Sequence, residues 1–143
     1  MKVLQTPITN IKHLIPQKAP FVMVDALLSF SKTNIVSSLT VKKENLFVNN
    51  NVLSEPGLIE NMAQTVALHT GYDYFLKGEP APTGYIGAIK KMEISTLPKL
   101  NETIETEAHI LQEFMGVTLV EISVFNAKKE KIASSVMKTV IAS

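Results

Sequence analysis

Residues 54–76 read SEPGLIENMAQTVALHTGYDYFL, and this stretch decides the fold. Ser54 can cap a helix and Pro56 is tolerated in a first helical turn. Apolar and small residues then recur at three- and four-residue spacing as far as Leu76, and the sequence Lys-Gly-Glu-Pro at 77–80 ends the pattern. The spacing predicts one long helix that is apolar around much of its circumference, as a helix enclosed by other elements must be.

The segments on either side of this helix have strand patterns. Those before it are rich in Val, Leu and Ile, and those after it show alternation or β-branched enrichment; they cover residues 21–30, 34–41, 84–94, 103–112, 116–126 and 131–141. A short helix is expected over residues 9–15, ended by Pro16. Strands grouped around one helix exclude a doubly wound α/β sheet. They predict an α+β hotdog fold, in which an antiparallel sheet of about six strands wraps around one long central helix.

Length and composition favour one domain that meets another subunit. The 143 residues suit a single domain over residues 1–143. Hydrophobic residues make up 45% and charged residues 19%, which excludes disorder and leaves few charges for the surface of a free monomer. We therefore expect some apolar surface to meet another subunit.

Charge and residue usage exclude several kinds of partner and site. The net charge of +1, with no basic run, gives no electrostatic basis for binding nucleic acid or a membrane surface. Without cysteine and with 3 scattered histidines, neither a metal site nor a cofactor is expected. No apolar segment reaches the ~20 residues of a membrane span, so a cytoplasmic protein is the expectation.

Three motifs are spread over most of the chain. Residues 14–25 read LIPQKAPFVMVD, residues 57–64 read GLIENMAQ, and residues 87–103 contain Lys90 and Pro98 before an Asn-Glu turn. Together they resemble the FabZ/FabA-type 3-hydroxyacyl-acyl-carrier-protein dehydratases of the hotdog superfamily, with the motifs L-L-P-H-R-x-P-F-L-L-V-D, P-G-V-L-x-x-E-A-M-A-Q and G-I-x-K-x-x-F-x-x-P-V-x-P-G-D. Within that superfamily, the sequence is most similar to short dehydratase-like members associated with polyene-type pigment biosynthesis. The resemblance implies water elimination from a 3-hydroxyacyl thioester in fatty-acid or polyene-type biosynthesis.

Two departures from the family pattern concern the catalytic groups. The family carries G-H-F-P before its central helix, and that histidine is the general base. This chain has FVNNNVL at residues 47–53 and lacks the histidine. The interval from Gly57 to Glu60 is also shorter than the family's interval from glycine to acid.

Dehydration needs a base for the Cα proton, an acid for the departing hydroxyl and a donor for the developing enolate oxygen. Glu60 lies early in an apolar helix, where burial would make its carboxyl a competent acid, and the motif makes it the catalytic candidate. Gln64 lies four residues on and can orient Glu60 or the thioester. From the residues alone, Glu60 can instead stabilise the helix dipole and Gln64 can be an exposed helix former.

Several residues are candidates for binding the substrate. They are small, apolar or amide-bearing residues near the expected site: Gly57, Asn49, Asn51, Met62, Tyr85, Ile86 and Gly87. The asparagines can hold a carbonyl or a water but cannot accept a proton, and a simple polar turn explains them equally.

None of the histidines is expected to replace the missing base. His69 lies nine residues after Glu60, which at about 100° per residue places it on the opposite, solvated side of the helix. His109 alternates with acidic residues on one face of a strand, so it is expected to be exposed. His13 lies in the short first helix, where a packing role is expected.

Three functional classes follow for this chain. The first is a dehydratase acting on an acyl thioester carried by acyl carrier protein or coenzyme A. The second is a hotdog acyl thioesterase that uses Glu60. The third is a non-catalytic acyl-binding subunit of a hetero-oligomeric dehydratase. The resemblance implies a dimer paired through the strand at residues 84–92, either with a second copy or with another hotdog subunit that supplies a histidine opposite Glu60.

Overall fold

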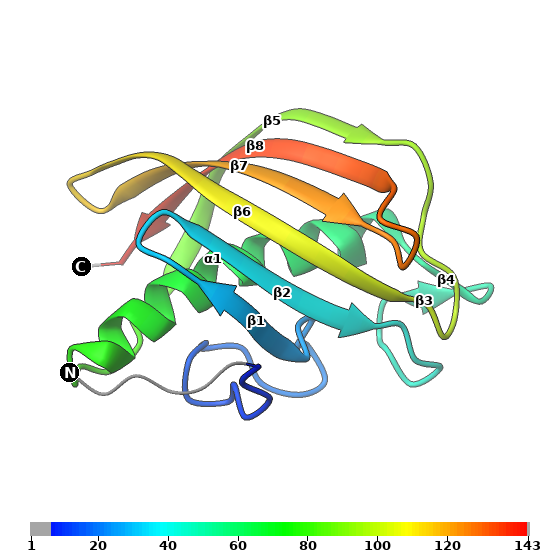
Figure 1. The fold of residues 1–143 in the computed structure, drawn as a ribbon, viewed down its shortest axis with the longest axis horizontal. Coiled ribbons are helices and arrows are strands. Elements are labelled where there is room, and N and C mark those ends of the chain that lie inside the picture. Colours follow the sequence, from blue (N-terminus) through cyan, green and yellow to red (C-terminus); the bar gives the residue numbers. More distant parts are fainter. Residues whose placement is uncertain (1–6, 143) are drawn as a thin grey trace.

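A six-stranded antiparallel sheet curls around one long helix in the computed structural model, which describes residues 7–142 (Figure 1). The elements in chain order are β1 (Ala26–Phe30), β2 (Asn34–Thr40), β3 (Val48–Asn49), β4 (Val52–Leu53), α1 (Glu55–Leu76), β5 (Gly84–Ile94), β6 (Thr103–Phe114), β7 (Val117–Phe125) and β8 (Lys131–Ile141). This is the α+β hotdog arrangement that the sequence predicts.

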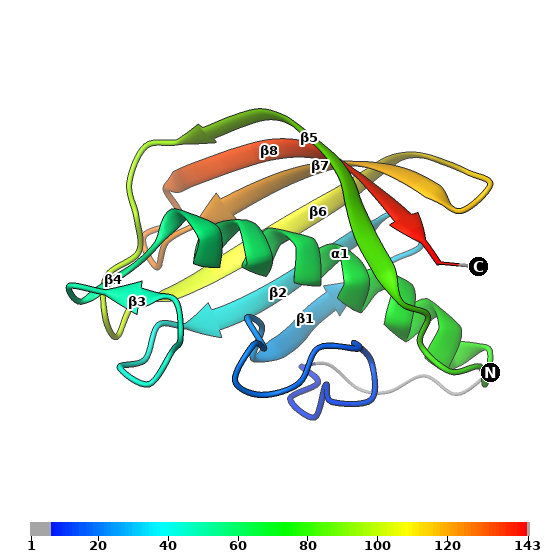
Figure 2. The ribbon, with the colours of Figure 1, turned by 180° about the vertical axis from the view of Figure 1, so that it is seen from behind.

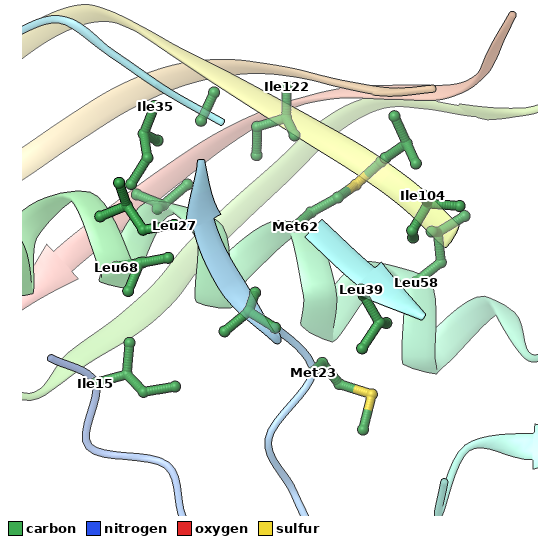
Figure 3. Close-up of a cluster of buried hydrophobic side chains, with 14 of the residues drawn as sticks. Ile15, Met23, Leu27, Ile35, Leu39, Leu58, Met62, Leu68, Ile104 and Ile122 are labelled. Carbon is green, nitrogen blue, oxygen red and sulfur yellow. The ribbon is translucent and has the colours of Figure 1, made fainter. Parts of the chain in front are cut away.

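The helix α1 lies against one face of the curled sheet (Figure 2). It begins after Ser54, has a proline in its first turn and ends at Leu76, as the sequence pattern predicts. Leu58, Met62 and Leu68 are fully buried in the cluster shown in Figure 3. Burial of such side chains contributes about 1.5–3 kcal/mol each, so the contact between helix and sheet is a main source of stability.

The sheet has the strand order β1-β2-β6-β7-β8-β5, with antiparallel neighbours throughout. Alternate residues of β2 and β7 are buried, because successive side chains of a strand point to opposite faces. The two edges of the sheet differ. Beyond β1, Ile8 pairs with Leu27 through two backbone hydrogen bonds of 2.8 Å, whereas no described residue pairs with the outer side of β5.

The segment before β1 differs from the sequence prediction. Instead of a helix over residues 9–15, the chain makes a turn in which the Leu14 amide donates to the Ile11 carbonyl oxygen at 2.9 Å. A short isolated helix is marginal, and the turn still buries Leu14 fully. The turn fits against α1 because Gly71 has no side chain, and a Cβ at Gly71 would overlap the Leu14 carbonyl oxygen.

A small hairpin, which the sequence reading missed, precedes the helix. Strands β3 and β4 pair through two residues each, and the turn between them holds Asn50 and Asn51 at φ values of 54° and 64°. Asparagine tolerates this left-handed backbone conformation better than most residues. Two-residue strands have no detectable period, which is why only the polar turn was visible in the sequence.

Within residues 7–142, no helix, α1 included, is long and apolar enough to cross a membrane.

Candidate active site

A cavity of about 290 Å³ lies between α1 and the paired strands β5 and β8. Its walls are mostly small or apolar residues with a few polar ones: Gln17, Glu60, Ala63, Val66, Ala67, Thr70, Pro82, Gly84, Tyr85, Ile86, Thr139, Val140 and Ile141. The small side chains of Ala63 and Ala67 lie one helical turn apart on α1 and leave room between the helix and the strands. The cavity suits an apolar ligand with a few polar groups.

Glu60 is the only carboxylate among the residues that line this cavity. It lies near the start of α1 and is half-buried. One carboxylate oxygen, Oε2, accepts a hydrogen bond of 2.9 Å from Gln64 Nε2. The side chain is therefore held at the cavity wall, where it can exchange a proton with a ligand.

Gln64 is fully buried and uses both ends of its amide. Its Oε1 accepts from the Met23 backbone amide at 2.6 Å, and its Nε2 donates to the Phe21 carbonyl oxygen at 2.8 Å as well as to Glu60. The amide joins α1 to the extended segment before β1 and fixes the Glu60 carboxylate from the side. The alternative that Gln64 is an exposed helix former is wrong.

Asn61 strengthens the same connection, and the sequence reading missed it. Its buried Nδ2 donates to the Met23 carbonyl oxygen at 2.7 Å, and its Oδ1 accepts from Thr106 Oγ1 on β6. Gln64 and Asn61 thus bind the amide and the carbonyl of one residue, Met23. The available signal was an amide side chain between the apolar Leu58 and Met62 on a helix predicted to be enclosed.

The predicted substrate-binding residues fall into two groups. Tyr85 and Ile86 line the cavity together with Glu60. Gly57, Asn49, Asn51, Met62 and Gly87 are not among the lining residues.

The structure shows where each residue of the second group lies. Gly57 packs closely under Phe47, and a Cβ there would come within 2.5 Å of the Phe47 Cβ. Met62 is buried in the core between helix and sheet (Figure 3). Asn49 and Asn51 are exposed on the β3–β4 hairpin, and Gly87 lies at an irregularity in the pairing of β5 with β8.

The histidines lie away from the cavity. The expected solvated position of His69 is wrong: its ring is buried, stacks on Phe30 at 4.8 Å between centroids, and places Nε2 2.8 Å from the Ser31 carbonyl oxygen. The end of β1 and the turn after it cover this side of α1. His109 is exposed, as predicted, and His13 packs edge-on against Phe75. Within residues 7–142, no group of three or more His, Cys, Asp or Glu side chains could hold a metal ion.

Comparison with solved structures shows which proteins share this fold. A chain of the structure titled "The Dehydratase Heterocomplex ApeI:P from Xenorhabdus doucetiae" superposes with a TM-score of 0.88 at 15% identity, covering 98% of this chain and 93% of that chain. Zebra fish thioesterase superfamily member 2 gives 0.65 at 14% identity, with coverages of 82% and 80%. A hypothetical thioesterase (Asp52Ala mutant) from Streptococcus pneumoniae TIGR4 gives 0.64 at 10% identity, with coverages of 81% and 88%.

The sequence matches none of the curated proteins. The family model described as "ApeP-like: ApeP dehydratase" matches residues 9–142, which is nearly the whole chain and includes the cavity, Glu60 and Gln64. The predicted resemblance to hotdog dehydratases is therefore confirmed, and the chain belongs to the ApeP-like dehydratase family.

Proposed function

We propose that this chain eliminates water from a 3-hydroxyacyl thioester, carried by acyl carrier protein or coenzyme A, as one subunit of a two-subunit dehydratase. The observation that carries the proposal is the placement of Glu60 at the wall of a mostly apolar cavity, held there by Gln64. An acyl chain suits such walls, and a single carboxyl suits proton delivery at one point of that chain.

In this proposal the chain supplies the acid for the elimination but not the base. A base removes the Cα proton, and the electrons of that C–H bond form the new double bond as the C3–O bond breaks. The protonated Glu60 carboxyl gives its proton to the departing hydroxyl, which leaves as water. None of the chain's histidines lines the cavity, which supports a base supplied from outside this chain; the competing mechanism uses Glu60 as both base and acid.

A second hotdog subunit is the proposed source of that base. Strand β5 is an edge strand that contributes Tyr85 and Ile86 to the cavity, and Tyr85 is 61% exposed. A subunit paired along β5 would therefore lie beside Glu60. The similar chain from Xenorhabdus doucetiae belongs to a dehydratase heterocomplex, which supports pairing with an unlike subunit.

Mass spectrometry of thioesters tests the proposal. The purified chain is incubated with a 3-hydroxyacyl-carrier-protein, alone and with a hotdog subunit that carries a histidine in the G-H-F-P motif. We expect loss of water from the acyl group only in the mixture. Loss of a general base typically costs 10²–10⁴-fold in rate, so the difference should be large. Robust dehydration by the chain alone would contradict the two-subunit site.

The Glu60→Gln variant tests the role of the carboxyl. The amide keeps the shape of the side chain but cannot deliver the proton, so the mixture should lose dehydration by about 10²–10⁴-fold without melting earlier. Glu121→Gln, which changes an exposed carboxylate on β7, is the matched control and should retain activity. Unchanged turnover in Glu60→Gln would assign Glu60 to helix stability instead.

The same experiment distinguishes the second candidate function. A cavity with one carboxylate and no histidine also suits a thioesterase in which Glu60 activates water. In that case the chain alone would release the free acyl acid and the unloaded carrier. Thioester binding without any mass change by the chain alone, together with dehydration by the mixture that is undiminished in Glu60→Gln, would indicate the non-catalytic subunit.

A further inference from the structure

A series of hydrogen bonds runs from the sheet to the Glu60 carboxylate. It begins at Thr106 on β6, whose hydroxyl donates to Asn61 Oδ1. Asn61 Nδ2 donates to the Met23 carbonyl oxygen at 2.7 Å, and the Met23 amide donates to Gln64 Oε1 at 2.6 Å. Gln64 Nε2 then donates to Glu60 Oε2 at 2.9 Å. Thr106, Asn61 and Gln64 are fully buried, so water does not compete for their hydrogen bonds.

The backbone of Met23 fixes the direction of these hydrogen bonds. Its carbonyl only accepts, so the Asn61 amide nitrogen faces it, and Asn61 Oδ1 is left to face Thr106. The Thr106 hydroxyl must therefore be the donor. The Met23 amide only donates, so it binds the oxygen of Gln64 and leaves Nε2 to face Glu60. Both side-chain amides thus have one orientation.

The orientation of Gln64 determines which oxygen of Glu60 carries the proton. Because Gln64 Nε2 only donates, Oε2 accepts a hydrogen bond and the hydrogen of the protonated carboxyl is on Oε1. Within the described part of the chain, no residue has a hydrogen bond to Oε1. There, Gln17 Oε1 is the only buried side-chain nitrogen or oxygen without a partner, so Glu60 Oε1 is accessible. The oxygen that carries the proton is therefore free to deliver it.

We infer that Thr106 is a positioning residue for the elimination and acts on Glu60 through Asn61, Met23 and Gln64; this inference rests on the proposed dehydratase function. Asn61 and Gln64, one turn apart on α1, hold the carbonyl and the amide of Met23. Without the Thr106 hydroxyl, Asn61 Oδ1 has no donor and its amide loses the fixed orientation. Met23 is then held firmly by Gln64 alone, and the hydrogen bond from Gln64 to Glu60 loses its fixed geometry.

The connection to Thr106 departs from the motif that this chain resembles. In that motif the acid is followed by alanine, in E-A-M-A-Q, whereas residues 60–64 read ENMAQ. Alanine has no side-chain group for either hydrogen bond of Asn61.

A second buried hydroxyl offers a comparison with Thr106. Ser37 on β2 pairs directly opposite Thr106, is also fully buried, and places its Oγ 2.7 Å from Thr65 Oγ1 on α1. Thr65 in turn donates to the Asn61 backbone carbonyl. This pair joins the sheet to the helix as well, but it has no hydrogen bond to Met23, Gln64 or Glu60.

Steady-state dehydration by the mixture with a histidine-bearing hotdog subunit tests the inference. Thr106→Val keeps the shape of the side chain and removes the donor. It should lower kcat by roughly 3- to 10-fold, the range of one hydrogen bond, with KM within about 2-fold, because Glu60 acts in the transition state. Thr106→Ser keeps the donor and should restore kcat. Ser37→Ala is the matched control, and its kcat should be unchanged.

A double variant covers the case in which Thr106→Val does not fold. Asn61→Ala/Thr106→Val leaves no side-chain amide without a donor and installs the alanine of the resembled motif. Its kcat should fall by roughly the same 3- to 10-fold, because the connection to Met23 is also lost.

Hydrogen exchange of the Gln64 side-chain amide gives a readout without any substrate. Its two hydrogens bind Phe21 and Glu60, and their exchange with deuterium can be followed by nitrogen-15 NMR of the full chain. Exchange should be roughly 3- to 10-fold faster in Thr106→Val and unchanged in Ser37→Ala and Thr106→Ser.

The outcomes separate this inference from the proposed function. Full kcat in Thr106→Val or in the double variant, an equal fall in Ser37→Ala, or no recovery in Thr106→Ser would overturn the role of Thr106 and leave the dehydratase function intact. Unchanged exchange of the Gln64 amide in Thr106→Val would overturn it as well. If the unaltered mixture eliminates no water, the proposed function fails and the inference fails with it.

Discussion

At the scale of single residues, the amide of Gln64 is the central connection of the site. It makes three hydrogen bonds, two to backbone groups of the segment before β1 and one to Glu60. The fold and the candidate chemistry therefore depend on the same side chain. Its loss should be visible in stability as well as in turnover.

The Gln64→Leu variant should be less stable by about 2–4 kcal/mol, because the Met23 amide and the Phe21 carbonyl would both lose their partner. Urea unfolding of the purified variant measures this change. Gln112→Leu, at an exposed position of β6, is the matched control and should change the free energy of unfolding little. If Gln64→Leu and the unaltered protein had equal stability, the hydrogen bonds of Gln64 to Met23 and Phe21 would not stabilise the fold.

The residue scale also shows where sequence reasoning stops. Glu60 could be predicted as a candidate because an acid in an apolar helix stands out and because a motif surrounds it. Asn61 could not, since its setting depends on contacts that no local pattern contains: it binds a residue 38 positions away. His69 was misplaced because a helical wheel assumes that the side away from the apolar stripe faces water, whereas Phe30 covers it.

At the scale of elements, regular periodicity explains which predictions succeeded. The strands at Gly84–Ile94 and Lys131–Ile141 have the predicted bounds, and α1 ends where predicted, because long periodic segments carry their signal in every residue. The segment at residues 9–15 has the apolar residues of a helix turn but no helix. There the close approach of the chain to α1 at Gly71 decides the conformation.

The contact at Gly71 gives a prediction at this scale. Gly71→Ala would push a Cβ into the Leu14 carbonyl, so we expect a net loss of about 1–3 kcal/mol. At a helical position with free space, the same substitution would instead stabilise the protein by roughly 1 kcal/mol, because alanine favours helix over glycine. Thermal melting followed by circular dichroism measures the change.

Asp73→Ala is the control for this measurement. It removes a surface ion pair with Lys77, the residue directly after the helix, so its cost should stay within about 1 kcal/mol. If Gly71→Ala melted at or above the Tm of the unaltered protein, the turn at residues 11–14 would not depend on the close contact between Gly71 and Leu14.

At the scale of the whole molecule, the proposed pairing through β5 can be tested directly. Ile89 on β5 is 43% exposed, so Ile89→Lys should fold normally while a charge at the edge prevents assembly. Light scattering after size-exclusion chromatography should then report a monomer, where the unaltered protein reports a dimer. Leu111→Lys, at a 49% exposed position on the interior strand β6, should remain dimeric.

The unequal edges of the sheet set how far such an assembly can grow. At the β1 edge, Ile8 already occupies backbone groups of Leu27, and β1 itself has only five residues. At the β5 edge, eleven residues are available to a neighbour. A molecule with one receptive edge can join only one other molecule along its sheet, and the pair then has no receptive edge left. Pairing through β5, as proposed, would therefore be self-terminating, and it would yield a closed particle of two chains instead of a fibre.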